Sequence, residues 1–127
     1  LNAASMRGSR LRTGLQSLAE KYDCIGDIRG SGLLMAVELV SDRKNKTTFP
    51  ATFPPTEHIR IFGLRHGLII YSRRTANGRY GDWFMVAPPL TITDSECDQL
   101  IARLDDTLAD FIKEARIHLQ AGESIDG

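Results

Sequence analysis

The sequence has few of the residues on which metal sites, disulfide scaffolds and membrane spans depend. It contains two cysteines, Cys24 and Cys97, and three histidines among 127 residues. The cysteines stand far apart and have no metal-ligand spacing, so zinc binding and thiol-redox chemistry have no support. No apolar run approaches the roughly 18 residues of a membrane-spanning helix, and residues 1–20 lack the apolar stretch of a signal peptide. We therefore expect reduced thiols, a cytoplasmic location and no membrane partner.

The chain also lacks net charge and any basic stripe interleaved with aromatic residues. Lys and Arg together number 16, as do Asp and Glu, and the isoelectric point is about 7.0. The basic residues are concentrated in the first 80 residues and the acidic ones in the remainder. This asymmetry fits an anion-binding face in the first part, or a solvated acidic helix in the second. A nucleic-acid partner is not indicated.

The composition and the spacing of apolar residues predict one globular domain with two strongly periodic helices. The fractions of hydrophobic residues, 42%, and charged residues, 25%, are ordinary for such a domain. The spacing predicts a helix over residues 3–22 and another that begins at the T-x-x-E capping box of Thr93 and Glu96. Their core-facing stripes consist of Leu11, Leu15, Leu18 and Tyr22 in the first, and Cys97, Ile101, Leu104, Leu108, Phe111 and Ala115 in the second. A shorter helix is predicted over residues 56–66.

The remaining segments predict a small, mostly antiparallel sheet. Residues 25–32 precede an almost wholly apolar run, 33–40, which is typical of an inner strand buried on both faces. Residues 41–54 read as a polar loop. The runs 68–71 and 83–86 flank Asn77-Gly78, a strong hairpin signal. The prediction is a two-layer α+β domain over residues 1–119, with helices on one face of the sheet, and a flexible tail over 120–127.

A search for a self-sufficient active site finds none. The sequence has no G-x-S-x-G, no P-loop and no G-x-G-x-x-G after a strand. His58 and His118 are predicted to face solvent, and His66 lies at a helix C-terminus. The four lysines fall on helix surfaces or in the polar loop, whereas a Schiff-base lysine needs a desolvated pocket. We expect no catalytic, cofactor-binding or metal-binding residue in this chain.

Arginines at the predicted hairpin are the best candidates for binding a ligand. Arg73, Arg74 and Arg79 flank the Asn-Gly turn, and a guanidinium at a strand end can bind a carboxylate through two parallel hydrogen bonds. The same spacing also fits a solvated basic loop or a salt bridge to Asp82. Trp83, just after the loop, fits either a pocket wall or the core.

Three segments resemble one enzyme family. Residues 27–40, DIRGSGLLMAVELV, are similar to the VRGxGLMxGxEL segment of class III, pyridoxal-phosphate-dependent aminotransferases. Residues 87–93, APPLTIT, followed by an acidic residue and a long amphipathic helix, resemble that family's APPLTIT segment. Residues 67–71, GLIIY, match its GLxxY strand. The order and spacing agree, and the resemblance covers nearly the whole chain.

The resemblance implies that this chain is only the C-terminal small domain of a fold-type I enzyme. In the family, a large domain carries the cofactor lysine, and the small domain closes over the active site. Pyridoxal phosphate is then expected in the full-length enzyme and not on this fragment, which alone should be inactive. The implied partners are the large domain of the same polypeptide, a second subunit in a homodimer, and an amino-acid or keto-acid substrate such as pyruvate. The alternative is a stand-alone, non-catalytic binding or dimerisation domain of the same fold.

The resemblance also suggests substrate-binding residues. Several members have a carboxylate-binding arginine two residues before the APPL alanine, where this chain has Met85. The ω-amino-acid:pyruvate branch has an arginine just before a Gly-Asp pair. Arg79, before Tyr80-Gly81-Asp82, is one residue off that pattern and is the candidate for the substrate carboxylate, with Trp83 beside it. Arg29 matches the family motif and is expected to tie Gly30 and Gly32 to neighbouring backbone.

Overall fold

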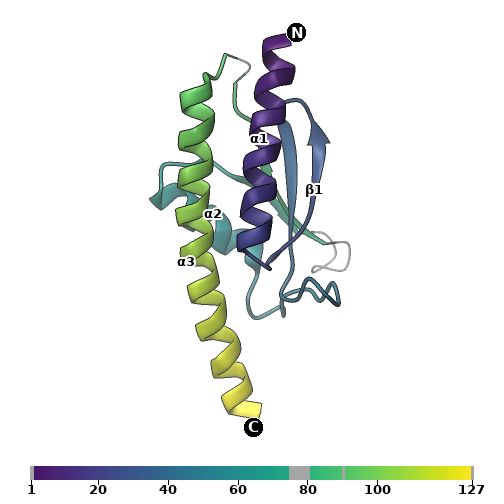
Figure 1. Ribbon diagram of the computed structural model, residues 1–127. Helices are drawn as coiled ribbons and strands as arrows, with labels where there is room; N and C mark the ends of the chain where they lie inside the picture. Colours follow the sequence, from purple (N-terminus) through teal and green to yellow (C-terminus); the bar gives the residue numbers. More distant parts are fainter. Residues whose placement is uncertain (1, 75–80, 90, 127) are drawn as a thin grey trace.

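A computed structural model describes residues 2–74, 81–89 and 91–126, and within them the chain forms three helices and four strands (Figure 1). The sheet order is β1-β2-β4-β3, and every neighbouring pair is antiparallel. The helices pack on one face of this sheet, which confirms the predicted two-layer α+β architecture. In chain order the elements are α1 (Asn2–Lys21), β1 (Ile25–Ser31), β2 (Leu34–Leu39), α2 (Pro55–Arg65), β3 (Tyr71–Arg74), β4 (Asp82–Val86) and α3 (Asp94–Asp126).

Helix α3 begins at the predicted capping box. The backbone N–H of Glu96 donates to Thr93 Oγ1 at 3.1 Å, and the backbone N–H of Thr93 donates to Glu96 Oε1 at 3.0 Å. Two helix-end donors are thereby satisfied. The helix runs to Asp126, through most of the segment 120–127 that the sequence predicts as a flexible tail. None of the described helices is long and apolar enough to cross a lipid bilayer.

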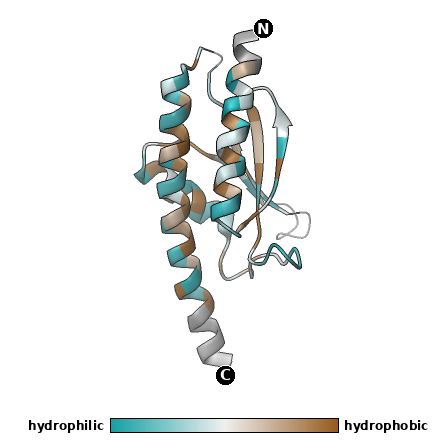
Figure 2. Cartoon of the chain, in the orientation of Figure 1, coloured by the Kyte–Doolittle hydropathy of each residue, from teal (hydrophilic) through white to brown (hydrophobic). Residues whose placement is uncertain are grey.

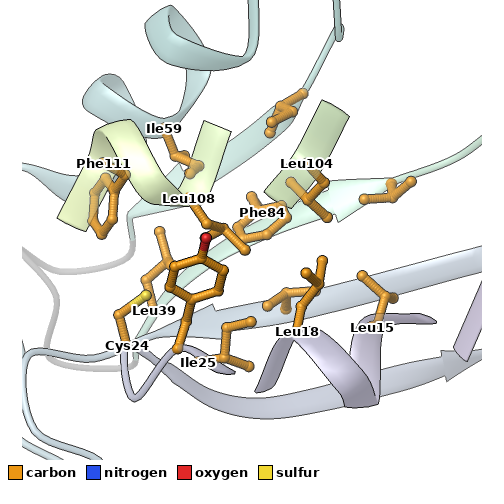
Figure 3. Close-up of a cluster of buried hydrophobic side chains, with 14 of the residues drawn as sticks. Leu15, Leu18, Cys24, Ile25, Leu39, Ile59, Phe84, Leu104, Leu108 and Phe111 are labelled. Atoms are coloured by element: carbon orange, nitrogen blue, oxygen red, sulfur yellow. The ribbon is translucent and has the colours of Figure 1, made fainter. Parts of the chain in front are cut away.

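The predicted apolar stripes of α1 and α3 form the core against the sheet. Hydrophobic and hydrophilic residues alternate along both helices (Figure 2). Leu15 and Leu18 of α1 and Leu104 and Leu108 of α3 meet Phe84 of β4 in one buried cluster (Figure 3). Every stripe residue is buried except Ile101, which is partly buried against the same core.

Strand β2 corrects one prediction. The apolar run 33–40 does not form a strand buried on both faces, because burial alternates along β2. Met35, Val37 and Leu39 point into the core, whereas Leu34 is 54% exposed. One sheet face therefore carries no helix in the described structure, although the sequence of β2 is apolar enough for both faces to be covered.

The hairpin of β3 and β4 forms as predicted, but β3 begins later than the run 68–71 suggests. Arg74 pairs with Asp82 in the register that closes the hairpin. The backbone N–H of Leu68 donates to Gly63 O at 2.8 Å, and Gly67 has a φ of +78°. The residues after α2 thus complete the helix end, so the sheet pairing starts only at Tyr71.

The segment 41–54, which the sequence predicts as a polar loop, contributes two side chains to the hydrophobic core. Phe49 and Phe53 are both buried and pack against Phe111 of α3. Arg43 of the same segment donates to Ala19 O in the last turn of α1 and, at 2.7 Å, to Tyr22 O just after the helix. A loop of many polar residues therefore anchors the end of one helix and completes the aromatic core.

Candidate functional site

The sheet face opposite the helices carries the candidate residue Trp83. We call it the open sheet face and define it by two rows of side chains that the strand register places across the sheet. Register partners lie side by side on one face of an antiparallel sheet. The first row is Arg29, Ala36, Met85 and Tyr71; the second is Asp27, Glu38, Trp83 and Arg73.

Trp83 is half-buried and does not belong to the hydrophobic core, so the core alternative is wrong. The Arg29 guanidinium lies over its indole ring, 5.5 Å from the ring centroid. Arg29 Nε also donates to Asp27 Oδ2 at 2.8 Å. Burial opposes ionisation of Asp27, but the hydrogen bonds from Arg29 and from the Ile28 N–H outweigh it and lower the pKa of this carboxyl. The stacked and ion-paired Arg29 thus has a defined orientation.

The expected role of Arg29 needs correction. It does not tie Gly30 to the backbone, because its contacts are with Asp27 and Trp83. Arg12 of α1 contacts that glycine instead, donating from Nη1 to Gly30 O at 3.2 Å. Arg29 of the sequence motif therefore belongs to the open sheet face and does not hold the turn between β1 and β2.

The backbone is closely surrounded by side chains at Gly81, just before β4. Gly81 has a φ of +98°, and a Cβ there would lie 2.7 Å from Trp83 Nε1 and 3.2 Å from Glu38 Oε2. Any other residue would be strained and would collide with these side chains. Lys46 Nζ in turn donates to Glu38 Oε1 at 3.2 Å and to Gly26 O at 2.7 Å. Gly81 therefore lies beside Glu38 of β2, which Lys46 of the segment 41–54 contacts in turn.

The candidate Arg79 falls in 75–80 and lies outside the described residues. Of its neighbours in the basic cluster, Arg73 is exposed in the second row of the open sheet face. Met85, which stands where several family members have an arginine, is in the first row of that face. Arg73, Trp83 and Met85 thus lie on one side of the sheet.

The residues of this chain do not suit covalent attachment of pyridoxal phosphate. All four lysines, Lys21, Lys44, Lys46 and Lys113, are described, and all are exposed. The hydrogen bond and charge of Asp105 raise the pKa of Lys21, whereas an imine-forming lysine requires the opposite shift. Among the described side chains, no group of three or more His, Cys, Asp or Glu residues could hold a metal ion.

The histidines and cysteines serve packing contacts. His66 Nε2 lies 2.6 Å from Asp110 Oδ2 of α3. His58, predicted to face solvent, is half-buried and stacks on Phe53 with ring centroids 4.2 Å apart. Burial raises the pKa of the Cys24 thiol to about 12, so the thiol stays protonated at neutral pH and is a poor nucleophile.

A cleft of about 260 Å³ opens where β3 begins and β4 ends. Its lining is mostly apolar and includes Ile69, which is 76% exposed, and Pro88 and Pro89 of the APPLTIT segment. The sequence analysis did not find this cleft, because its walls come from three segments that meet only in the folded chain. The first turns of α3 complete it through Glu96, Gln99, Leu100 and Arg103.

Comparison with known proteins places these features in one family. The family model described as aminotransferase class-III matches residues 1–108. An alanine–glyoxylate aminotransferase 2 homologue from Arabidopsis thaliana is 43% identical over 102 residues, which are 80% of this chain and 20% of that protein. A taurine–pyruvate aminotransferase from Rhodobacter capsulatus is 31% identical over 107 residues, or 84% of this chain and 23% of the relative.

Solved structures agree with the sequence matches. An (S)-enantioselective omega-transaminase from Thermomicrobium roseum superposes with a TM-score of 0.72 at 34% identity, over 86% of this chain and 22% of the other. The chain thus spans about a quarter of the length of the proteins that it matches, or less.

Proposed function

Because this chain belongs to the class III aminotransferase family, we propose that it is the C-terminal small domain of a pyridoxal-phosphate-dependent transaminase. The reaction would transfer an amino group from an amino donor to a keto acid such as pyruvate. The family match over residues 1–108 carries this proposal, and the fold agrees with that of an omega-transaminase. The homodimer that the resemblance implies and the cytoplasmic location that the sequence predicts are part of the same proposal.

The cofactor would be anchored by a lysine outside this chain. When bound, pyridoxal phosphate supplies the electron sink for amino-group transfer. The lysines of this chain are all exposed and do not fit the role of its anchor. The fragment alone should therefore be inactive, and its contribution would be to bind the substrate and close the active site.

Arg79 and Trp83 are the residues that we propose for substrate binding. Trp83 lies on the open sheet face, where its half-buried indole can form one wall of a pocket. Arg79 comes two residues before Gly81 in the sequence. The side chains of Trp83 and Glu38 lie close beside Gly81. A guanidinium near this point could bind a substrate carboxylate through two hydrogen bonds.

The test is Arg79→Ala in the full-length enzyme. A hydrogen bond to a charged group contributes about 1.5–3 kcal/mol, which corresponds to a loss of roughly 10- to 150-fold in kcat/KM for a carboxylate substrate, mainly through KM. An amine donor without a carboxylate should be affected much less. Arg60→Ala, at an exposed position on α2, is the matched control and should leave KM and kcat/KM unchanged. An unchanged KM for pyruvate in Arg79→Ala would contradict the assignment.

A further inference from the structure

The side chain of Arg29 crosses one strand of the open sheet face to reach Trp83. Arg29 is on β1 and Trp83 is on β4, and β2 lies between these two strands. The register partner of Arg29 on β2 is Ala36, a side chain short enough for an arginine to pass over. The guanidinium carbon of Arg29 lies 5.5 Å from the centroid of the Trp83 ring. A cation in this position is attracted by the negative face of the aromatic ring.

A second contact holds the same guanidinium from the β1 side. Arg29 Nε donates to Asp27 Oδ2 at 2.8 Å, and the backbone N–H of Ile28 donates to Asp27 Oδ1 at 2.9 Å. The carboxylate is therefore oriented by the backbone as well as by the arginine. The side chain of Arg29 is 73% exposed, so each contact by itself is weak. Together they hold the guanidinium between a fixed carboxylate and the indole.

The indole of Trp83 is also confined along its nitrogen-bearing edge. Gly81 has a φ of +98°, and a Cβ at this position would lie 2.7 Å from Trp83 Nε1. The indole nitrogen thus occupies space that any other residue at position 81 would need. The ring is contacted by a guanidinium on one face and by backbone at one edge, yet Trp83 is only half-buried. Part of its surface is therefore open to a ligand.

We propose that Arg29 is a positioning residue, which holds the Trp83 indole in the orientation in which the ring forms a wall for the substrate. This inference rests on the proposed function, because it takes Trp83 as a substrate-binding residue. Arg29 acts through Trp83 and does not itself contact the substrate. Its loss should weaken substrate binding and leave the chemical step unchanged, so KM should rise while kcat stays nearly constant.

The expected size of this effect follows from the contact that is lost. A cation–π contact at an exposed site corresponds to about a two- to fivefold change in an equilibrium constant. We therefore expect KM for an aromatic amine donor to rise about two- to fivefold when Arg29 is replaced by Gln. An aromatic donor can stack on the indole, whereas alanine offers only a methyl group. KM for alanine should accordingly change less.

Fluorine NMR of the full-length enzyme labelled with 5-fluorotryptophan tests the orientation of the ring directly. The resonance of Trp83 is identified by its absence from Trp83→Phe. Arg29→Gln removes the cation and should shift and broaden this resonance, whereas Arg29→Lys keeps a cation and should restore both the resonance and KM in part. The matched control is Arg65→Ala, because Arg65 lies over the Phe62 ring of α2 at 5.0 Å. It should change neither the Trp83 resonance nor KM.

An unchanged Trp83 resonance in Arg29→Gln would overturn the proposal. So would an unchanged KM for the aromatic donor in Arg29→Gln while Trp83→Phe raises that KM, because the orientation of the ring would then have no effect on binding. If Trp83→Phe leaves KM unchanged, the role of Trp83 in the proposed function is wrong, and the positioning role is overturned with it. Wild-type enzyme without transaminase activity would refute the proposed function, whereas the NMR comparison would still decide whether Arg29 orients the indole.

Discussion

Leu108 offers a direct test of how α3 is held on the sheet. Its side chain is fully buried in the middle of α3 and lies beside Phe84 of β4 (Figure 3). Leu108→Ala removes buried methyl groups and leaves a cavity, while the helix propensities of leucine and alanine differ little. Leucine-to-alanine changes in such sites cost about 2–5 kcal/mol, and for a position with no exposure we expect about 3 kcal/mol.

That free energy converts to a measurable melting shift. Unfolding entropy of about 2.1 cal/mol/K per residue near 60 °C gives roughly 270 cal/mol/K for a chain of this size, so Leu108→Ala should lower Tm by about 11 °C. Leu64→Ala on α2, where the side chain is 54% exposed, is the matched control and should change Tm by less than about 2 °C. Calorimetry on the 127-residue chain measures both. Equal shifts in the two variants would refute the packing of α3 described here.

Three further expectations follow from the capping box, the α1–α3 contacts and the lysines. Thr93→Ala should cost about 1 kcal/mol in urea unfolding, because the Glu96 N–H loses its acceptor; an unchanged midpoint would contradict the cap. Partial burial of Asp105 opposes its ionisation, but hydrogen bonds from Tyr22 and Lys21 lower its pKa, so the stability that it contributes is present above about pH 4 and lost as the pH falls further. The stability gap between wild type and Asp105→Asn should therefore narrow below about pH 4, and a constant gap in urea melts would count against this. Mixing the 127-residue chain with pyridoxal phosphate should give no stable imine absorbance, whereas a lasting imine band would show that one of the exposed lysines can hold the cofactor.

The periodicity of the sequence predicted α1 and α3 well, because apolar residues at helical spacing form the face of a helix that packs on the core. Leu104 and Leu108 had to share one face at helical spacing, and burial of that face is what the structure shows. The capping box was equally local, since Thr93 and Glu96 contact only each other's backbone and side chain. Such features depend on residues within a few positions in the chain.

Long-range contacts escaped the sequence analysis for the same reason. Nothing near Arg43 indicates that it reaches back to the carbonyls of Ala19 and Tyr22. Phe49 and Phe53 were two apolar residues in a segment dominated by polar ones, and their aromatic composition was the available signal. The cleft beside β3 and the contact between Arg29 and Trp83 likewise depend on residues far apart in the chain.

The sequence predicted β2 to be buried on both faces, but burial alternates along the strand, and this difference bears on what the strand contacts. An apolar run predicted a strand covered on both faces, but the described helices cover only one. The composition of a strand records every surface that it contacts in the working protein, including contacts made outside these 127 residues. Leu34, which is 54% exposed, would be ordinary in a buried strand and is unfavourable in a solvated one. On this reasoning the apolar composition of β2 and its exposure in these 127 residues are compatible if a surface outside them covers Leu34, and substitution of Leu34 should then affect the full-length enzyme more than the 127-residue chain.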